Sequence, residues 1–143
     1  MITTDLKILR TKSTQLSLAH YKALHIFERL DKELKESTIP GLGLTAIQIN
    51  IPYCVSIIRM PDLVLDLYNM EILEMSEPFI FVGEGCLSLP GKIGKTRRYN
   101  RIKIRNGDGR IINATDIYST VIQHEFQHQL GELFIDHLAE ESD

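Results

Sequence analysis

The spacing of apolar side chains predicts a helix near the start of the chain. Six positions follow one another at steps of three and four residues, so they form one stripe along a helical face. The stripe consists of Leu16, His20, Ala23, Phe27, Leu30 and Leu34. Charged residues fill many of the positions between them, so we expect an amphipathic helix over residues 14–35 that ends before Pro40.

The middle of the chain changes to short apolar runs bounded by glycine, proline and asparagine, a pattern typical of β-strands. These runs predict strands at residues 53–59, 63–68 and 78–82. Two further segments, 96–105 and 110–113, flank the sequence Asn-Gly-Asp-Gly, which is a strong signal for a hairpin turn. The strands are therefore expected to pair antiparallel.

Two glycine-bearing segments interrupt this pattern and are expected to form loops. Residues 41–50 hold two glycines directly after a proline, which breaks a helix and lets the backbone approach another group closely. Residues 84–91 form the second loop, which places Cys86 between a glycine and the sequence Leu-Ser-Leu-Pro.

A second helix can begin at Thr115 or Asp116 and runs to about Leu130, where Gly131 stops it. Helix, short strands, hairpin and helix do not follow the alternation of a parallel sheet. The order predicts the α+β class, with short antiparallel strands and a hairpin packed around this central second helix. A length of 143 residues predicts a single domain over residues 1–143.

Composition and charge exclude several classes of function. The net charge is −3, and the basic residues of segment 92–105 alternate with apolar ones, so we expect no nucleic-acid site. No apolar run approaches the length of about 20 residues that spans a bilayer, and the N-terminus lacks the apolar segment of a signal peptide. Only two cysteines, Cys54 and Cys86, are present, which excludes a disulfide framework and predicts a reducing, cytoplasmic compartment.

The candidate chemistry lies in the second helix, where residues 124–128 read His-Glu-Phe-Gln-His. Positions four apart on a helix lie about 40° from each other and one turn along, so His124 and His128 face one point, as two metal ligands do. Glu125 is rotated about 100° from His124 and can exchange protons with a water at the metal rather than bind the metal. The spacing therefore predicts a metal site with a general base beside it.

A catalytic metal usually has three protein ligands, so we expect a third ligand elsewhere in the chain. The continuation typical of one metallopeptidase class requires a histidine where this chain has Phe134. Asp136 and His137 are candidates for the third ligand. Cys86 is a better one, because it lies in a glycine-bearing turn close to a proline, which is unusual for a plain core cysteine.

Three motifs, in the right order, resemble those of the peptide deformylase family. They read Gly-Leu-Gly-Leu-Thr-Ala-Ile-Gln at residues 41–48, Glu-Gly-Cys-Leu-Ser at 84–88 and Gln-His-Glu-Phe-Gln-His at 123–128. The likeness includes the spacing between the motifs and covers nearly the whole chain. The resemblance implies a metal-dependent hydrolase that removes the N-terminal formyl group from nascent polypeptides and releases formate.

The resemblance also implies the metal and its ligands. Cys86, His124 and His128 would bind one divalent ion, Fe²⁺ first, with Zn²⁺, Ni²⁺ or Co²⁺ as substitutes. The substrate would be a nascent chain that begins with N-formylmethionine, and the ribosome is a further candidate partner. A monomer without a membrane partner is expected, in the cytoplasm of the cell, or of the host if the protein is phage-encoded.

The roles in catalysis are implied in the same way. Glu125 would act as general base and then as general acid. Gln48 and the backbone N–H of Leu87 would stabilise the developing oxyanion. The substrate main chain would bind in an extended form along the backbone of Leu42, Gly43 and Gly85.

The chain departs from the family pattern at a few positions. Gln127 stands where the family usually has aspartate, and Thr45 replaces the first of two alanines. Arg98 lies twelve positions after Cys86, where a family arginine often pairs with acids near the metal, and we expect it to pair with Glu84. Substitution of a residue that hydrogen-bonds to a metal ligand typically changes metal affinity or activity by about 10–100-fold. A short form without the long C-terminal helix common in bacterial members is expected, similar to phage or organellar members.

Two other interpretations stay open at this point. A metallopeptidase would use the same helix motif, but the residue at 134 and the loops that carry Gln48 and Cys86 do not favour it. A catalytically silent metal-binding module near the ribosomal exit has no need of Glu125 or Gln48, and structural zinc usually has four protein ligands. Both catalytic side chains are present, which favours the hydrolase.

Overall fold

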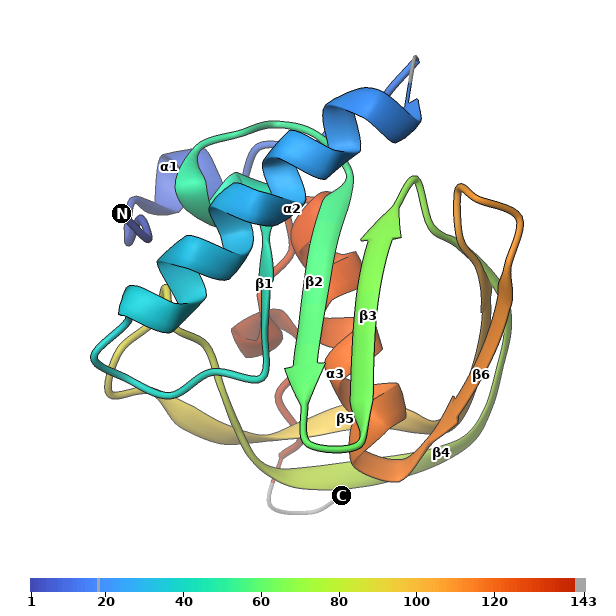
Figure 1. Cartoon of the computed structure of the whole chain (residues 1–143). Helices are drawn as coiled ribbons and strands as arrows, with labels where there is room; N and C mark the ends of the chain where they lie inside the picture. Colours follow the sequence, from blue (N-terminus) through green and yellow to red (C-terminus); the bar gives the residue numbers. More distant parts are fainter. Residues whose placement is uncertain (18, 141–143) are drawn as a thin grey trace.

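Two three-stranded antiparallel sheets and two longer helices form most of the described part of the chain (Figure 1). The computed structural model describes residues 1–17 and 19–140, and gives only the backbone of residues 19–21. The sheets have the strand orders β1-β2-β3 and β4-β5-β6. In chain order the elements are α1 (Leu6–Leu9), α2 (Ala19–Glu36), β1 (Gly43–Thr45), the 3₁₀ helix η1 (Ala46–Ile49), β2 (Val55–Met60), β3 (Leu63–Tyr68), β4 (Glu71–Gly85), β5 (Ile93–Arg105), β6 (Ile111–Thr115), α3 (Asp116–Gln129) and the 3₁₀ helix η2 (Phe134–His137). The predicted α+β class is confirmed.

The first sheet is covered by a helix on each face. Helix α2 lies across one face, and α3 lies behind the other, toward the second sheet (Figure 1). Val55 and Ile57 of β2 belong to the apolar cluster that includes α2, whereas Ile58 and Met60 belong to the one that includes α3. Strand β2 is thus buried on both faces, which explains its nearly continuous apolar sequence.

The first long helix begins at residue 19 rather than at residue 14. Both backbone polar groups of Leu16 bond to the side chain of Asn69, its N–H to Oδ1 and its carbonyl to Nδ2, each at 2.9 Å. This contact with a residue far along the chain holds the segment outside the helix. The place of His20 in the apolar stripe is not tested, because its side chain lies outside the described residues.

The strand predictions at 53–59 and 63–68 correspond to β2 and β3, but the prediction at 78–82 covers only part of β4. Most of β4 is exposed or half-buried, so its sequence lacks the alternation that marks a strand packed on one face. The expected loop at 41–50 is wrong in part, because it contains β1 and η1. The loop at 84–91 begins later, after β4 has ended at residue 85.

The predicted hairpin joins β5 to β6, and its turn is bound to β3. The buried side chain of Asn106 accepts a hydrogen bond from the N–H of Tyr68 at 2.9 Å and donates to the carbonyl of Asp66 at 3.2 Å. At Gly107 a Cβ would lie 2.3 Å from the ring of Tyr68, so only glycine fits there. The turn therefore ties the second sheet to the first.

Two expectations from composition can be compared with the structure. Cys54 and Cys86 are both free thiols. Burial raises the pKa of Cys54, which keeps this thiol in its less reactive protonated form. In the described part of the chain, no helix combines the length and the apolar composition needed to cross a membrane.

We expect Asn106→Ala to lower the free energy of unfolding by about 1–3 kcal/mol, because the buried N–H of Tyr68 and the part-buried carbonyl of Asp66 lose their partner. Urea unfolding followed by circular dichroism measures this. Arg110→Ala, at an exposed position of the same turn, is the control and should stay within about 0.5 kcal/mol of the unsubstituted protein. Equal stability of the two variants would contradict the prediction.

Candidate metal centre

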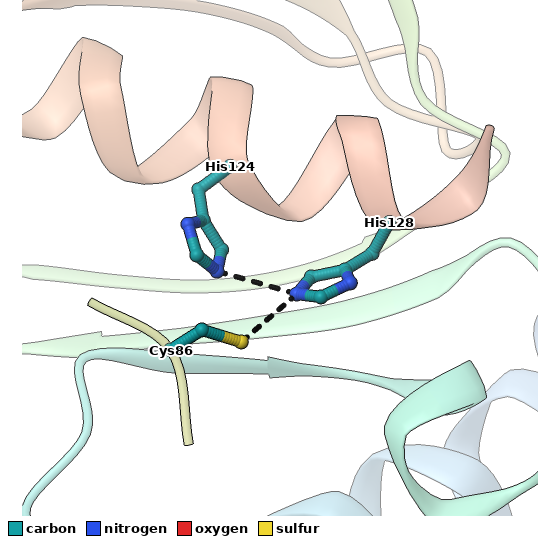
Figure 2. A group of neighbouring side chains, drawn as sticks. All are labelled: Cys86, His124 and His128. Carbon is teal, nitrogen blue, oxygen red and sulfur yellow. Dashed lines mark hydrogen bonds between the residues drawn. The ribbon is translucent and has the colours of Figure 1, made fainter. Parts of the chain in front are cut away.

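Helix α3 and the end of β4 bring the three predicted ligands together. Nε2 of His124 lies 3.2 Å from Nε2 of His128, and Sγ of Cys86 lies 3.4 Å from Nε2 of His128 (Figure 2). Both histidines project from α3 toward Cys86, which directly follows β4 (Figure 2). One ligand atom from each residue lies within 4.8 Å of the other two.

These distances fit a metal ion. Thiolate binds zinc-like ions at about 2.3 Å and imidazole at about 2.0–2.1 Å, so neighbouring ligand atoms of a tetrahedral ion lie about 3.3–3.6 Å apart. The observed 3.2 and 3.4 Å come within about 0.2 Å of that spacing. One thiolate and two imidazoles suit Fe²⁺, Zn²⁺ and similar divalent ions, and three protein ligands are the number typical of a catalytic site.

The alternative third ligands take part in other contacts. Asp136 forms an ion pair with Arg10 and accepts the N–H of Leu133 at 2.9 Å. Nε2 of His137 lies 2.8 Å from a carboxylate oxygen of Glu132. Neither residue belongs to the ligand cluster, so of the three candidates only Cys86 joins the two helix histidines.

A buried carboxylate orients His124 from the side away from the other ligands. Glu84 accepts hydrogen bonds from Nδ1 of His124, from the hydroxyl of Thr96 and from Nε of Arg98, at 2.7, 2.7 and 2.8 Å, and a second bond from Nη2 of Arg98. Because Nδ1 of His124 donates to Glu84, its Nε2 is the nitrogen left for a metal. The expected pair of Arg98 with Glu84 is confirmed.

The charge of Glu84 is held by these partners. Burial alone would raise the pKa of Glu84, but the hydrogen bonds from His124 and Arg98 outweigh it and lower this pKa to about 2. Burial also opposes the charged form of His124, yet its bonds to Cys86 and Glu84 raise the pKa of His124 to about 10. The pKa of His128 is lowered well below its usual value by burial and by the charge of His124. Metal binding therefore has to displace a proton, since a metal takes the unprotonated imidazole.

Gln127 extends this arrangement on the far side of Arg98. Its Oε1 accepts a hydrogen bond from Nη1 of Arg98 at 2.6 Å. The guanidinium is fully buried and thus has a carboxylate on one side and an amide oxygen on the other. Gln127 acts here through its amide oxygen as a hydrogen-bond acceptor, and the carboxylate of an aspartate is also an acceptor.

Glu125 lies beside the ligands and not among them. Its Oε1 accepts a hydrogen bond from the hydroxyl of Thr45 at 2.9 Å. Its Oε2 lies against Gly43, where a Cβ would come within 2.6 Å of it, so position 43 requires glycine to leave room for the carboxylate. Burial raises the pKa of Glu125, against the opposing effects of His124 and the Thr45 hydroxyl. A raised pKa suits a group that both accepts and returns a proton near neutral pH.

Gln48 reaches the same place from η1. Its Oε1 accepts the backbone N–H of Thr45 at 2.9 Å, which turns its amide NH₂ toward the loop after β4. There Nε2 donates to Oγ of Ser88 at 3.1 Å and to Sγ of Cys86 at 3.6 Å. The side chain is buried and held at both ends, so its donors are fixed beside the ligand cluster.

A cavity of about 380 Å³ opens beside these groups. Its wall includes all six residues expected to act on a substrate, namely Leu42, Gly43, Gln48, Gly85, Leu87 and Glu125, and two of the expected ligands, Cys86 and His124. It also includes residues that sequence analysis did not single out, namely Phe81, Ile117, Thr120 and Val121. In sequence these four resemble ordinary strand and helix core positions, so nothing in the pattern marks them.

Known proteins are similar to this chain in sequence and in fold. The sequence model of the polypeptide deformylase family matches residues 1–143. The chain belongs to this family. A peptide deformylase of Helicobacter pylori is 33% identical over 147 residues, which cover 93% of this chain and 81% of that protein. The resemblance stated from three motifs is therefore confirmed.

Two solved structures show how far the likeness extends. The peptide deformylase of Thermotoga maritima superposes with a TM-score of 0.85 at 27% identity, covering 98% of this chain and 97% of that one. A probable peptide deformylase from Synechococcus phage S-SSM7 gives 0.81 at 28% identity, covering 96% and 99%. The family removes the N-formyl group from nascent polypeptides, and this member is a metal-dependent hydrolase.

We expect Gln127→Asp to be tolerated and to slow the loss of metal to a chelator modestly. The carboxylate keeps the bond from Arg98 and makes it charge-assisted, which is roughly twice as strong as a bond to a neutral acceptor. Chelator-challenge half-lives of the two proteins measure this. Gln127→Ala is the matched control, and its shorter half-life would show that the acceptor matters. Clearly faster metal loss in Gln127→Asp than in the unsubstituted protein would contradict the prediction.

Proposed function

We propose that this deformylase acts on polypeptides that begin with N-formylmethionine, and that Cys86, His124 and His128 hold one Fe²⁺ for the reaction. The observation that carries the proposal is the position of a buried Glu125 in the wall of the same cavity as two of these ligands. A purely structural metal site has no use for such a carboxylate, whereas hydrolysis of an amide needs a group that transfers protons, as a carboxylate can.

The proton transfers fall to Glu125. A divalent ion at this site would supply Lewis-acid chemistry and lower the pKa of a bound water toward about 7. Glu125 takes a proton from the attacking water and delivers it to the amine nitrogen as the formyl C–N bond breaks, so formate and a free N-terminus are released. Its Oε2 is the oxygen placed to do this, because Oε1 is engaged by Thr45.

The negative charge that develops on the formyl oxygen requires hydrogen-bond donors. Gln48 offers its amide, whose NH₂ is already directed at Cys86. The backbone N–H of Leu87 has no acceptor among the described residues and lies next to that ligand in the chain. In comparable sites the loss of one such donor costs about 2.7–4 kcal/mol of transition-state stabilisation.

Two sheet edges beside the cavity are available to bind the main chain of a substrate. Strand β1 is the edge of the first sheet and β4 is the edge of the second, and the cavity is lined by Gly43 of one and Gly85 of the other. An extended peptide can add to such edges through main-chain hydrogen bonds. This arrangement supports binding of the peptide along Leu42, Gly43 and Gly85, with the formyl group directed at Glu125.

Further expectations stay predictions. A ferrous ion is favoured by the thiolate and by the family resemblance, and a free ligand thiol favours a reducing, cytoplasmic compartment. The single catalytic domain, the monomeric state and contact with the ribosome rest on the sequence alone.

Formate release from formyl-Met-Ala-Ser by anaerobically prepared protein tests the activity. Glu125→Ala should keep the bound metal but lower kcat by about 10²–10⁴-fold, because it removes proton transfer and no ligand. Metal content is measured on the same samples. Glu28→Ala, at an exposed position of α2, should retain full activity. Loss of metal together with activity in Glu125→Ala would place Glu125 among the ligands and contradict its assigned role.

We expect the ferrous form to lose activity in air faster than a nickel-substituted form, because Fe²⁺ beside a thiolate is open to oxidation. Parallel samples of both forms are assayed for formate release and for free thiol after increasing times in air. Samples kept under argon are the control. Equal lifetimes of the two forms in air would contradict the oxygen sensitivity expected of a ferrous centre at this site.

A further inference from the structure

A chain of buried polar side chains leads from the interior to Glu125. Nε2 of Gln129 donates to Oγ of Ser56 at 3.1 Å, Oγ of Ser56 lies 3.1 Å from Oγ1 of Thr45, and the Thr45 hydroxyl reaches Oε1 of Glu125 at 2.9 Å. All four of these residues are at most 3% exposed. They come from β1, β2 and α3, so the chain joins the first sheet to the helix that carries the metal ligands.

The direction of the hydrogen bonds follows from the chemistry of the groups. The hydroxyl hydrogen of Thr45 points at Glu125, where Oε1 at 2.9 Å is the nearer acceptor and the backbone carbonyl oxygen lies at 3.4 Å. The oxygen of Thr45 then accepts from Ser56, whose own oxygen accepts from the amide of Gln129. Each hydroxyl thus donates once and accepts once, and both point toward the carboxylate.

Thr45 also acts through its backbone. Its N–H donates to Oε1 of Gln48 at 2.9 Å. This bond holds the oxygen end of the Gln48 amide at Thr45 and leaves the NH₂ end directed at Cys86. The hydroxyl and the N–H of one residue therefore hold the candidate proton carrier and the candidate oxyanion donor. The backbone at Thr45 is extended, with φ −112° and ψ 148°, so a β-branched residue adopts it without strain.

We propose that Thr45 is a positioning residue, whose hydroxyl holds Oε1 of Glu125 so that Oε2 alone faces the cavity. The inference rests on the proposed function of Glu125. It adds a role for a hydroxyl that the family motif usually lacks, since that motif usually has an alanine at this position. Buried hydroxyls carry a desolvation penalty unless they are paired. The hydroxyl that Thr45 brings into this cluster is paired with Ser56, whose own oxygen accepts from Gln129.

The test compares Thr45→Val, which keeps the volume and removes the hydroxyl, with Thr45→Ser, which keeps the hydroxyl. Formate release from formyl-Met-Ala-Ser gives kcat and KM, and metal content is measured on each sample. We expect Thr45→Val to lower kcat by about tenfold, with KM within about twofold and metal content unchanged, because the lost bond is to a charged group. Thr45→Ser should restore kcat to within about threefold of the unsubstituted protein.

Several outcomes would overturn the proposal. Unchanged kcat in Thr45→Val would do so, as would equal losses in Thr45→Val and Thr45→Ser, which would indicate a steric role. A rise in KM at constant kcat would show that Thr45 affects substrate binding instead. If Thr45→Val does not fold, Thr45→Ala, the residue usual in the family motif, replaces it and should lower kcat in the same direction.

An infrared readout separates this proposal from the proposed function. The carboxylate stretch of Glu125 is isolated as the difference between the spectra of the unsubstituted protein and of Glu125→Gln. It should shift in Thr45→Val and return in Thr45→Ser. If the band shifts but the unsubstituted protein releases no formate, the positioning holds and the proposed function fails. A band that does not shift overturns the positioning, whatever the activity.

Discussion

The buried ion pair of Glu84 and Arg98 is the interaction on which the candidate metal centre depends. It joins the end of β4 to the middle of β5, and through His124 it joins both strands to α3. Removing one partner of such a pair costs about 3–5 kcal/mol, because the other charge is left buried and alone. The spacing of Cys86 and His124 therefore depends on a contact that contributes no metal ligand.

Around this pair, the two sheets meet α3 from different sides and divide the chemistry between them. The second sheet supplies the thiolate and the carboxylate that orients His124, while the first supplies Thr45 and, just after it, Gln48. Helix α3 contacts both, and consecutive residues on it serve different partners: His124 bonds to Glu84 and Glu125 bonds to Thr45. The site thus exists only where both sheets pack on one helix.

The parts of the fold that depend on local signals could be predicted from the sequence. The helix over the His-Glu-Phe-Gln-His motif has a capping residue and a glycine stop, the hairpin after Arg105 has strong turn chemistry, and both are present. The sequence predicts only part of strand β4, because most of its side chains are exposed or half-buried and leave no alternating apolar pattern. The Thr45 contact could not be foreseen, since residues 45, 56, 125 and 129 meet only through tertiary packing. Ligands at fixed helical spacing are visible in a sequence, whereas their supporting contacts are not.

The two-sided burial of β2 has a consequence for folding fidelity. Ser56 faces the site, whereas its neighbours Val55 and Ile57 belong to the cluster under α2. A slip of β2 by one residue against β1 would exchange these faces and put a valine or an isoleucine where Thr45 now finds a hydroxyl. Both faces of β2 are apolar, so hydrophobic burial alone discriminates weakly between the two registers. Registry of this strand pair therefore decides whether a folded molecule is also an active one.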